Sequence, residues 1–246
     1  MECIRPIGAA LACALAAGCG DRGETVTILA AASLTEAFGE LGEELERRDP
    51  GLTVRFSFAA SSTLAAQVAE GAPGDVFATA DMRTMRIAQE AGVLAGEPVI
   101  FARNTLVIAV PAGNPAGVSS LADLARPEIL VALCSRPVPC GTAAQAALRA
   151  AGLSVTPVTW ERDVKAVLTK VMLGEVDAGL VYATDARAAG DRIEAIPFPE
   201  AREVVNAYPI AVLRDAPSPR AARTFVDLVL SEPGRAVLTD AGFEEP

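Results

Sequence analysis

Four places in this sequence combine hydroxyl or backbone N–H donors with the expected start of a helix. They lie at Ser33 and in the segments 60–63, 138–142 and 161–164. The first N–H groups of a helix have no partner inside it, and the helix dipole makes that end positive. Four such ends facing one space would bind an anion without needing a lysine or an arginine. The plain alternative at each place is helix capping, through a Ser33–Glu36 capping box or an Asp163 N-cap.

The composition excludes several kinds of catalytic and metal site. The 246 residues include no histidine, which removes Ser-His-Asp and Cys-His nucleophile pairs and the histidine zinc motifs. One Trp and two Tyr are too few for the stacking surfaces of sugar or single-strand nucleic-acid binders, and a net charge of −10 disfavours nucleic acid. An enzyme would need a carboxylate pair or a lone serine at the proposed site, and we find neither there. We therefore expect a binding protein without a cofactor, not an enzyme.

The chain begins with a segment typical of export. Arg5 precedes an apolar run over residues 7–18, which is the size of a signal-peptide core and shorter than the roughly 20 residues that span a bilayer. The run ends in LAAGC, which resembles a bacterial lipobox, although Ala16 stands where that motif has leucine. We expect a signal peptide over 1–18, a lipid on Cys19 and a tether over 19–24. Ordinary cleavage without lipid is the alternative, and either route places the protein in the periplasm or on the outer face of the cytoplasmic membrane.

Strand and helix patterns alternate from Thr25 onward, which predicts a mostly parallel α/β sheet. The expected strands are 26–30, 52–58 and 75–80, and the expected helices are 34–47, 64–70 and 82–91. Two strands then follow one another between residues 98 and 113 without a crossover helix, so the chain leaves one lobe for another. The second lobe repeats the plan, with helices expected at 143–150 and 164–173 and strands at 155–160 and 178–182. A strand at 206–213 returns to the first lobe, which predicts lobe I over 25–102 and 207–246 and lobe II over 103–206.

Three cysteines remain after the predicted export segment, at positions 19, 134 and 140. Cys134 ends an expected strand, and Cys140 follows six residues later. An oxidising compartment favours a Cys134–Cys140 disulfide. A structural metal is disfavoured with two thiols and no histidine, whereas two buried free thiols are an open alternative.

Six blocks of the sequence together resemble the molybdate-binding periplasmic proteins of ABC importers. The blocks are AAASL at 30, FAASSTLAAQVAEGAPGDVF at 58, VPCG at 138, ERDVKAVL at 161, GLVYATDA at 179 and YPIAV at 208. The resemblance rests on their order and spacing and covers nearly all of the chain after the export segment. It implies a two-lobed solute-binding protein, type II periplasmic-binding-protein-like. Each lobe would be a mostly parallel sheet flanked by helices, with the ligand in the cleft between them.

The resemblance also implies the ligand and its donors. We expect molybdate, and also tungstate, to accept hydrogen bonds from the hydroxyl and N–H groups of Ser33 and Ser61. The N–H groups of Cys140 and Val164 and the phenol of Tyr182 complete the set. The family often has alanine at the position of Cys140, which is compatible with use of the N–H alone. A Tyr182 bonded only to protein is the plain alternative. The implied partner is the membrane permease of an ABC importer, and we expect a monomer that binds no nucleic acid and no metal beyond the oxyanion.

Two other functions are compatible with parts of the pattern. One is a receptor for a different oxyanion such as sulfate or phosphate. A set of donors suits a fully ionised dianion and suits phosphate less well, because the proton that phosphate partly keeps needs an acceptor. Charge does not separate sulfate from molybdate, so the resemblance decides for molybdate. The other is the effector domain of a transcription regulator, against which the export signal and the missing DNA-binding helices both count.

Overall fold

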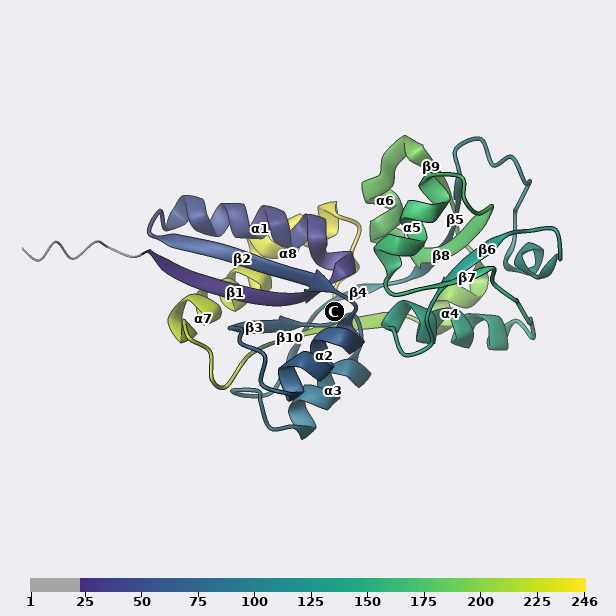
Figure 1. Cartoon of the computed structure of the whole chain (residues 1–246). Helices are drawn as coiled ribbons and strands as arrows, with labels where there is room; N and C mark the ends of the chain where they lie inside the picture. The colour runs from purple at the N-terminus through teal and green to yellow at the C-terminus, as the bar shows by residue number, and fades with distance from the viewer. Residues whose placement is uncertain (1–22) are drawn as a thin grey trace, which may run out of the picture.

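Apolar strands and amphipathic helices build the first lobe around one five-stranded sheet. The computed structural model describes residues 23–246 and draws this lobe on the left of Figure 1. Across the sheet lie β2 (Leu52–Ala59), β1 (Glu24–Ala31), β3 (Val76–Ala78), β10 (Asn206–Val212) and β4 (Val99–Asn104). Strand β10 runs antiparallel to both of its neighbours, and the remaining strands are parallel to one another.

Helices cover both faces of this sheet. They are α1 (Thr35–Arg48), α7 (Pro219–Leu230) and α8 (Glu232–Asp240) on one face, and α2 (Ser61–Ala69) and α3 (Met82–Glu90) on the other. Phe38 of α1 packs edge to face on Phe225 of α7, with 5.3 Å between the ring centroids. Leu64 and Met85 belong to a separate apolar cluster under α2 and α3. The sheet is therefore buried on both sides, as parallel sheets generally are.

The second lobe repeats the plan of the first. Its strands, in order across the sheet, are β7 (Thr159–Glu161), β6 (Val131–Cys134), β8 (Ala178–Tyr182), β5 (Leu106–Pro111) and β9 (Ile193–Ile196). Here β5 is the single antiparallel strand, in the same sheet position as β10. Helices α5 (Val164–Met172) and α6 (Ala183–Ala189) lie on one face, and α4 (Pro139–Ala150) lies on the other. The repeated plan confirms the predicted two-lobed α/β fold.

Short 3-10 turns complete the element list. They are η1 (Ala32–Leu34), η2 (Leu121–Ala125), η3 (Gly190–Arg192) and η4 (Pro199–Glu203). The turn η1 links β1 directly to α1. It lies at the edge of the first lobe that faces the second, beside the start of α5 (Figure 1).

The polypeptide passes between the lobes twice. It leaves the first sheet at the end of β4, enters β5 after Thr105, and returns before β10. Asn104 and Asn206 are register partners in the first sheet, and Arg103 pairs with Ala207. The lobe limits predicted at 102/103 and 206/207 therefore fall beside the two crossing points. That these limits also separate two folding units stays a prediction.

Several predicted element limits differ from the structure. Helix α2 begins at Ser61 instead of residue 64, and α4 begins at Pro139 instead of residue 143. Proline is favourable in the first helical turn because its missing N–H would have no partner there, so Pro139 extends α4 forward. Strand β7 has three residues where six were expected. Helix α6 was not expected, because it follows β8 without a polar break.

The N-terminal predictions lie outside the described residues. These are the signal peptide over 1–18, the lipidation of Cys19 and nearly all of the tether. From residue 23 to residue 246, no helix has both the length and the apolar character needed to cross a bilayer.

Candidate oxyanion site between the lobes

The five predicted ligand residues line one cavity where the lobes meet. Its first-lobe side comes from the ends of β1 and β2 and the start of α2, and its second-lobe side comes from the starts of α4 and α5 and the end of β8. The lining residues are Ala31, Ala32, Ser33, Ala59, Ala60, Ser61, Ala80, Val138, Pro139, Cys140, Asp163, Val164 and Tyr182. The five predicted residues are each no more than 4% exposed, so the lobes are closed over the cavity.

Three of these residues place backbone N–H groups at helix starts. Ser61 and Val164 are the first residues of α2 and α5, and Cys140 is the second residue of α4. N–H groups at these positions have no acceptor within their own helix. No hydrogen bond to another described residue uses them either. The cavity therefore receives free donors and the positive ends of three helix dipoles.

Ser33 does not cap α1, which corrects the predicted Ser33–Glu36 capping box. Ser33 lies inside the turn η1, and the N-cap position of α1 is Leu34, without any side-chain cap. The Ser33 Oγ instead lies 2.9 Å from the Oη of Tyr208, a residue 175 positions away. A capping hydroxyl must come from the residue just before the helix, and the turn moves Ser33 out of that position.

Ser61 has a defined hydrogen-bond partner as well. Its Oγ accepts a 3.0 Å hydrogen bond from the backbone N–H of Ala80, at the end of the loop after β3. A backbone N–H can only donate, so the Ser61 hydroxyl uses a lone pair in this bond and keeps its hydrogen free. Ser61 thus brings two donors to the cavity, its N–H and its O–H.

Tyr182 ends β8 with its phenol at the cavity. The Tyr182 Oη is buried and has no hydrogen-bond partner among the described residues. Burial raises the pKa of Tyr182 well above its ordinary value, so the phenol keeps its proton. An unpaired buried hydroxyl costs about 1–3 kcal/mol, which a ligand that accepts its hydrogen would recover.

One acidic side chain also borders the cavity. Asp163 is the N-cap of α5, as predicted, and its Oδ1 accepts a 2.9 Å hydrogen bond from the N–H of Ala166. Its Oδ2 lies 3.5 Å from the guanidinium Nε of Arg162. Both oxygens therefore have positively polarised partners that reduce repulsion of an anion. In the described part of the chain, no lysine or arginine lines the cavity.

A disulfide anchors the start of α4. Cys134, the last residue of β6, is bonded to Cys140 with 5.8 Å between the Cα atoms. Gly141 fits beneath this loop because a Cβ there would lie 2.0 Å from the backbone oxygen of Ser135. The bond and the glycine together keep the loop between β6 and α4 close to the end of the sheet.

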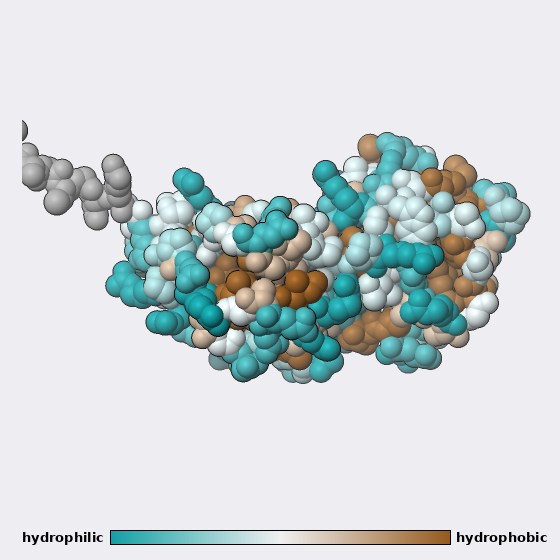
Figure 2. All heavy atoms as spheres, turned by 60° about the horizontal axis from the view of Figure 1, so that its bottom comes forward, coloured by the Kyte–Doolittle hydropathy of each residue, from teal (hydrophilic) through white to brown (hydrophobic). Residues whose placement is uncertain are grey.

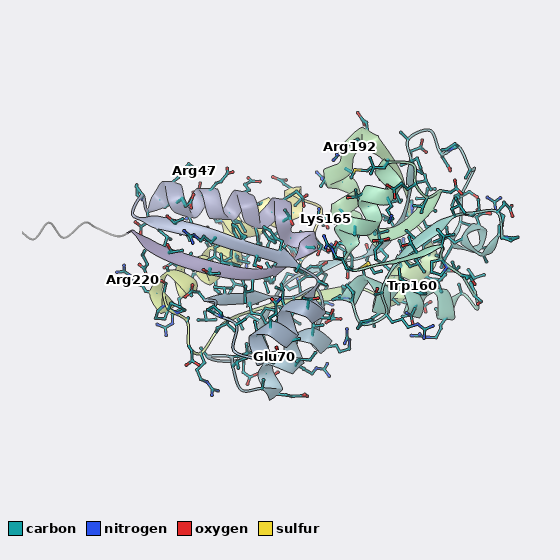
Figure 3. The ribbon with its side chains drawn as sticks, in the orientation of Figure 1. Arg47, Glu70, Trp160, Lys165, Arg192 and Arg220 are labelled. Carbon is teal, nitrogen blue, oxygen red and sulfur yellow. A yellow bond between two sulfur atoms is a disulfide. The ribbon has the colours of Figure 1, made fainter. Side chains whose placement is uncertain are left out.

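Polar contacts outside the cavity also connect the lobes. Lys165 of α5 projects between the lobes (Figure 3), and its Nζ lies 2.7 Å from both carboxylate oxygens of Glu36 in α1. The same Nζ lies 2.9 Å from Oδ1 of the buried Asp185, as an ion pair without hydrogen-bond geometry. Elsewhere on the interface, Arg83 of α3 donates a 2.6 Å hydrogen bond to the carbonyl of Pro137. These contacts hold the closed arrangement from both lobes.

The pKa values of the Lys165 group follow from burial and charge. Burial acts to lower the pKa of Lys165, but the nearby carboxylates of Asp185 and Glu36 outweigh it and raise the value. Burial raises the pKa of Asp185 to about 6, against the opposing effect of Lys165. Lys165 therefore stays charged at neutral pH and keeps its attraction to Glu36 across the interface.

The size and lining of the cavity suit a small anion. The space open to the centre of a water-sized sphere is about 10 Å³, far below the roughly 300–1,000 Å³ of clefts that hold drug-sized ligands. Within residues 23–246, no three His, Cys, Asp or Glu side chains are grouped to hold a metal ion.

On the face drawn in Figure 2, hydrophilic and apolar residues are mixed over both lobes, without one large apolar area.

Two residues that the sequence did not identify complete the surroundings of Ser33. Tyr208 contacts the Ser33 hydroxyl directly, and the side chain of Asn104 contacts Tyr208. The block YPIAV contains Tyr208, but its spacing gives no sign that the phenol reaches a serine in η1. Only the pairing of β10 with β4 brings Tyr208 and Asn104 together.

Comparisons with known proteins place this geometry among binding proteins. A family model described as bacterial extracellular solute-binding protein matches residues 26–244. The molybdate-binding protein ModA of Mycobacterium tuberculosis is 45% identical over 230 residues, covering 94% of this chain and 88% of that protein.

Two solved structures match the fold at 19% identity. The periplasmic molybdate-binding protein of Azotobacter vinelandii has a TM-score of 0.79, over 90% of this chain and 99% of its own. The sulfate-binding protein SubI of M. tuberculosis has a TM-score of 0.78, over 90% of this chain and 87% of its own. The shared fold therefore does not by itself distinguish the two anions.

Proposed function

Because the chain belongs to the bacterial extracellular solute-binding protein family, we propose that it captures molybdate, and also tungstate, between its lobes for an ABC importer. The observation that carries the proposal is the single cavity lined by Ser33, Ser61, Cys140, Val164 and Tyr182. Their hydroxyl and N–H groups are neutral donors from both lobes. A relative at 45% identity bears the name molybdate-binding protein, which supports this anion over others. The protein is a solute-binding component and not an enzyme.

Binding and closure are coupled in this proposal. A tetrahedral dianion offers acceptors in every direction, so it can pair donors of both lobes at once. The Lys165–Glu36 and Arg83–Pro137 contacts then form as the lobes close. The closed form is the one presented to the membrane permease, which is the proposed partner. We propose that the receptor acts as a monomer, binds no nucleic acid and is anchored by lipid on Cys19, for which mass spectrometry of membrane-extracted protein is the test.

Sulfate is the second candidate ligand, because a sulfate-binding protein shares the fold. Sulfate and molybdate carry the same charge and shape and differ in size. Phosphate is a poorer candidate because it retains a proton at neutral pH, and the five proposed residues present donors.

Calorimetric titration and thermal unfolding with molybdate, tungstate, sulfate and phosphate test the proposal. Perchlorate, a tetrahedral anion with a single charge, is the control. Molybdate at 100 times its dissociation constant is expected to stabilise the fold by about 2.7 kcal/mol. Tungstate should follow closely, and sulfate, phosphate and perchlorate should bind more weakly. No response to molybdate, or an equal response to sulfate, contradicts the assignment.

A further inference from the structure

A short hydrogen-bond network connects the Ser33 hydroxyl to the crossing strands β4 and β10. The Ser33 Oγ lies 2.9 Å from Tyr208 Oη, and Tyr208 Oη lies 3.4 Å from Asn104 Nδ2. All three side chains are buried. The Asn104–Tyr208–Ser33 network lies behind the cavity and is hydrogen-bonded to it through Ser33, while the Tyr208 ring also packs edge to face on Tyr182, with 6.0 Å between the ring centroids.

The orientation of the Asn104 amide is fixed by a backbone group. The N–H of Thr105 donates a 3.0 Å hydrogen bond to Asn104 Oδ1. A backbone N–H cannot accept, so this atom must be the amide oxygen. The amide nitrogen therefore faces the other way, toward Thr184 Oγ1 at 2.8 Å and Tyr208 Oη at 3.4 Å.

This orientation decides which way Tyr208 donates. Burial raises the pKa of Tyr208, so the phenol keeps its hydrogen. Its hydrogen-bond partners in the described structure are Asn104 Nδ2, which cannot accept, and Ser33 Oγ, which can. The Tyr182 ring also packs edge to face on Tyr208, but the Tyr182 hydroxyl makes no hydrogen bond with it. The phenol hydrogen therefore goes to Ser33. Among residues 23–246 the serine's own hydrogen has no acceptor, so it is left for the cavity.

The Ser61 hydroxyl is also oriented as a donor toward the cavity, by a different neighbour. Its oxygen accepts from the Ala80 N–H, which leaves its hydrogen free. Both first-lobe serines thus have a donor behind them and a hydrogen to give in front. A freely rotating hydroxyl could present a lone pair instead and accept a proton from a ligand.

We propose that Asn104 and Tyr208 are positioning residues that fix the Ser33 hydroxyl as a donor and so disfavour oxyanions that retain a proton. This inference rests on the proposed function, because it concerns the anion held in that site. A protonated anion would bring its own hydrogen to a serine that is held in the donor orientation. One of two donors would then remain unpaired in a buried site.

A double-mutant cycle between Tyr208→Phe and Ser33→Ala tests the proposal by calorimetry. Tyr208→Phe keeps the ring and removes the bond behind Ser33, so molybdate affinity should fall by up to about tenfold. In the Ser33→Ala background the same substitution should have almost no effect. Tyr182→Phe is the matched control, because this second buried tyrosine is proposed to contact the ligand itself. The drop in molybdate affinity that it causes should therefore be the same with and without Ser33.

Asn104→Asp is a more specific test, because it keeps the shape of the side chain but replaces the amide donor by an acceptor and so reverses the direction of the hydrogen bonds. Its ionised carboxylate can accept hydrogen bonds from both the Thr105 N–H and the Tyr208 hydroxyl. The Tyr208 hydrogen then points to residue 104, and the Ser33 hydroxyl donates to Tyr208 Oη instead of to the ligand. Molybdate affinity should fall by about one to two powers of ten. The ratio of phosphate to molybdate affinity should rise. The added negative charge also lowers the affinity for any bound anion, with or without Ser33. The part of the affinity loss that disappears in the Ser33→Ala background therefore measures the effect of the network.

The outcomes separate this proposal from the assignment of the ligand. If the wild type binds another oxyanion, the molybdate proposal fails and the cycle is measured with that anion. Equal losses with and without Ser33, or an unchanged phosphate ratio in Asn104→Asp, overturn the positioning role. If no oxyanion binds the wild type, both proposals fall. Thermal unfolding without ligand shows that each variant is folded.

Discussion

The two lobes bring different mixtures of hydroxyl and backbone N–H donors to the same cavity. The first lobe contributes the Ser61 N–H at the start of α2 and two serine hydroxyls, each with a second group behind its oxygen, Tyr208 for Ser33 and Ala80 for Ser61. The second lobe contributes the N–H groups of helix starts, and the phenol of Tyr182. A hydroxyl rotates and must be oriented by a neighbour, whereas a backbone N–H is oriented by the helix it begins. The hydroxyl donors of the first lobe therefore depend on groups distant in the sequence, whereas the N–H donors at Cys140 and Val164 in the second lobe depend on local backbone geometry.

The use of backbone donors explains why residues without polar side chains can line the anion site in the second lobe. Cys140 and Val164 carry no polar group suited to an oxyanion, yet both border the cavity. Their position at the start of α4 and α5 supplies the N–H whatever the side chain is. The same freedom allows Cys140 to serve the disulfide with Cys134.

The largest expected effect comes from removing one of these backbone donors. Val164→Pro deletes an N–H at the first position of α5, where proline is favourable and the preceding Asp163 is already extended. The helix should persist while molybdate affinity falls by about one to two powers of ten, the value of a hydrogen bond to a charged group. Calorimetric titration measures the change.

Val164→Ala is the matched control for that substitution. It shortens the same buried side chain and keeps the N–H, so affinity should stay within about threefold of the wild type, well under one hydrogen bond. If alanine weakens binding as much as proline does, the side chain matters more than the backbone, and the contrast between the lobes is wrong.

The disulfide should affect stability more than binding. Replacing both Cys134 and Cys140 by alanine removes the bond but leaves the Cys140 N–H in place. The closed loop is short, so the free energy of unfolding should fall by roughly 2 kcal/mol, at the low end of the usual range. Denaturant unfolding measures this loss. A drop in molybdate affinity as large as the one expected for Val164→Pro would show that the bond positions the donor.

The smallest effect is expected at the contact that closes the lobes. Glu36→Gln removes a half-exposed partner of Lys165, and such pairs contribute about 0–1 kcal/mol. Affinity should fall by no more than about fivefold. The loss should shrink at high salt, which screens the pair.

Glu40→Gln is the control for that substitution. It removes the same charge from an exposed residue one helical turn along α1, where no ion pair forms in the described structure. Calorimetry at low and high salt compares the two variants. Equal losses would assign the effect to overall charge and not to the contact between the lobes.

The sequence by itself determined the fold class and the cavity lining. Strand and helix periods are local patterns, and helix starts carry local signals such as Asp163 before α5 and Pro139 in the first turn of α4. In an α/β sheet these starts gather at the carboxyl ends of the strands, which is why the four predicted helix starts border one cavity. Tyr182, which lines the same cavity, was implied by the family resemblance. The absence of histidine likewise pointed away from catalysis before any coordinates.

Only the tertiary structure decided what each hydroxyl does. Ser33 fits a capping box by its spacing to Glu36, yet its partner is Tyr208, 175 positions away. That pairing depends on β10 returning beside β4 and on a 3-10 turn that moves Ser33 off the cap position. Hydrogen-bond direction depends on every neighbour of an oxygen at once, and those neighbours come from strands that meet only when the chain has crossed between the lobes twice.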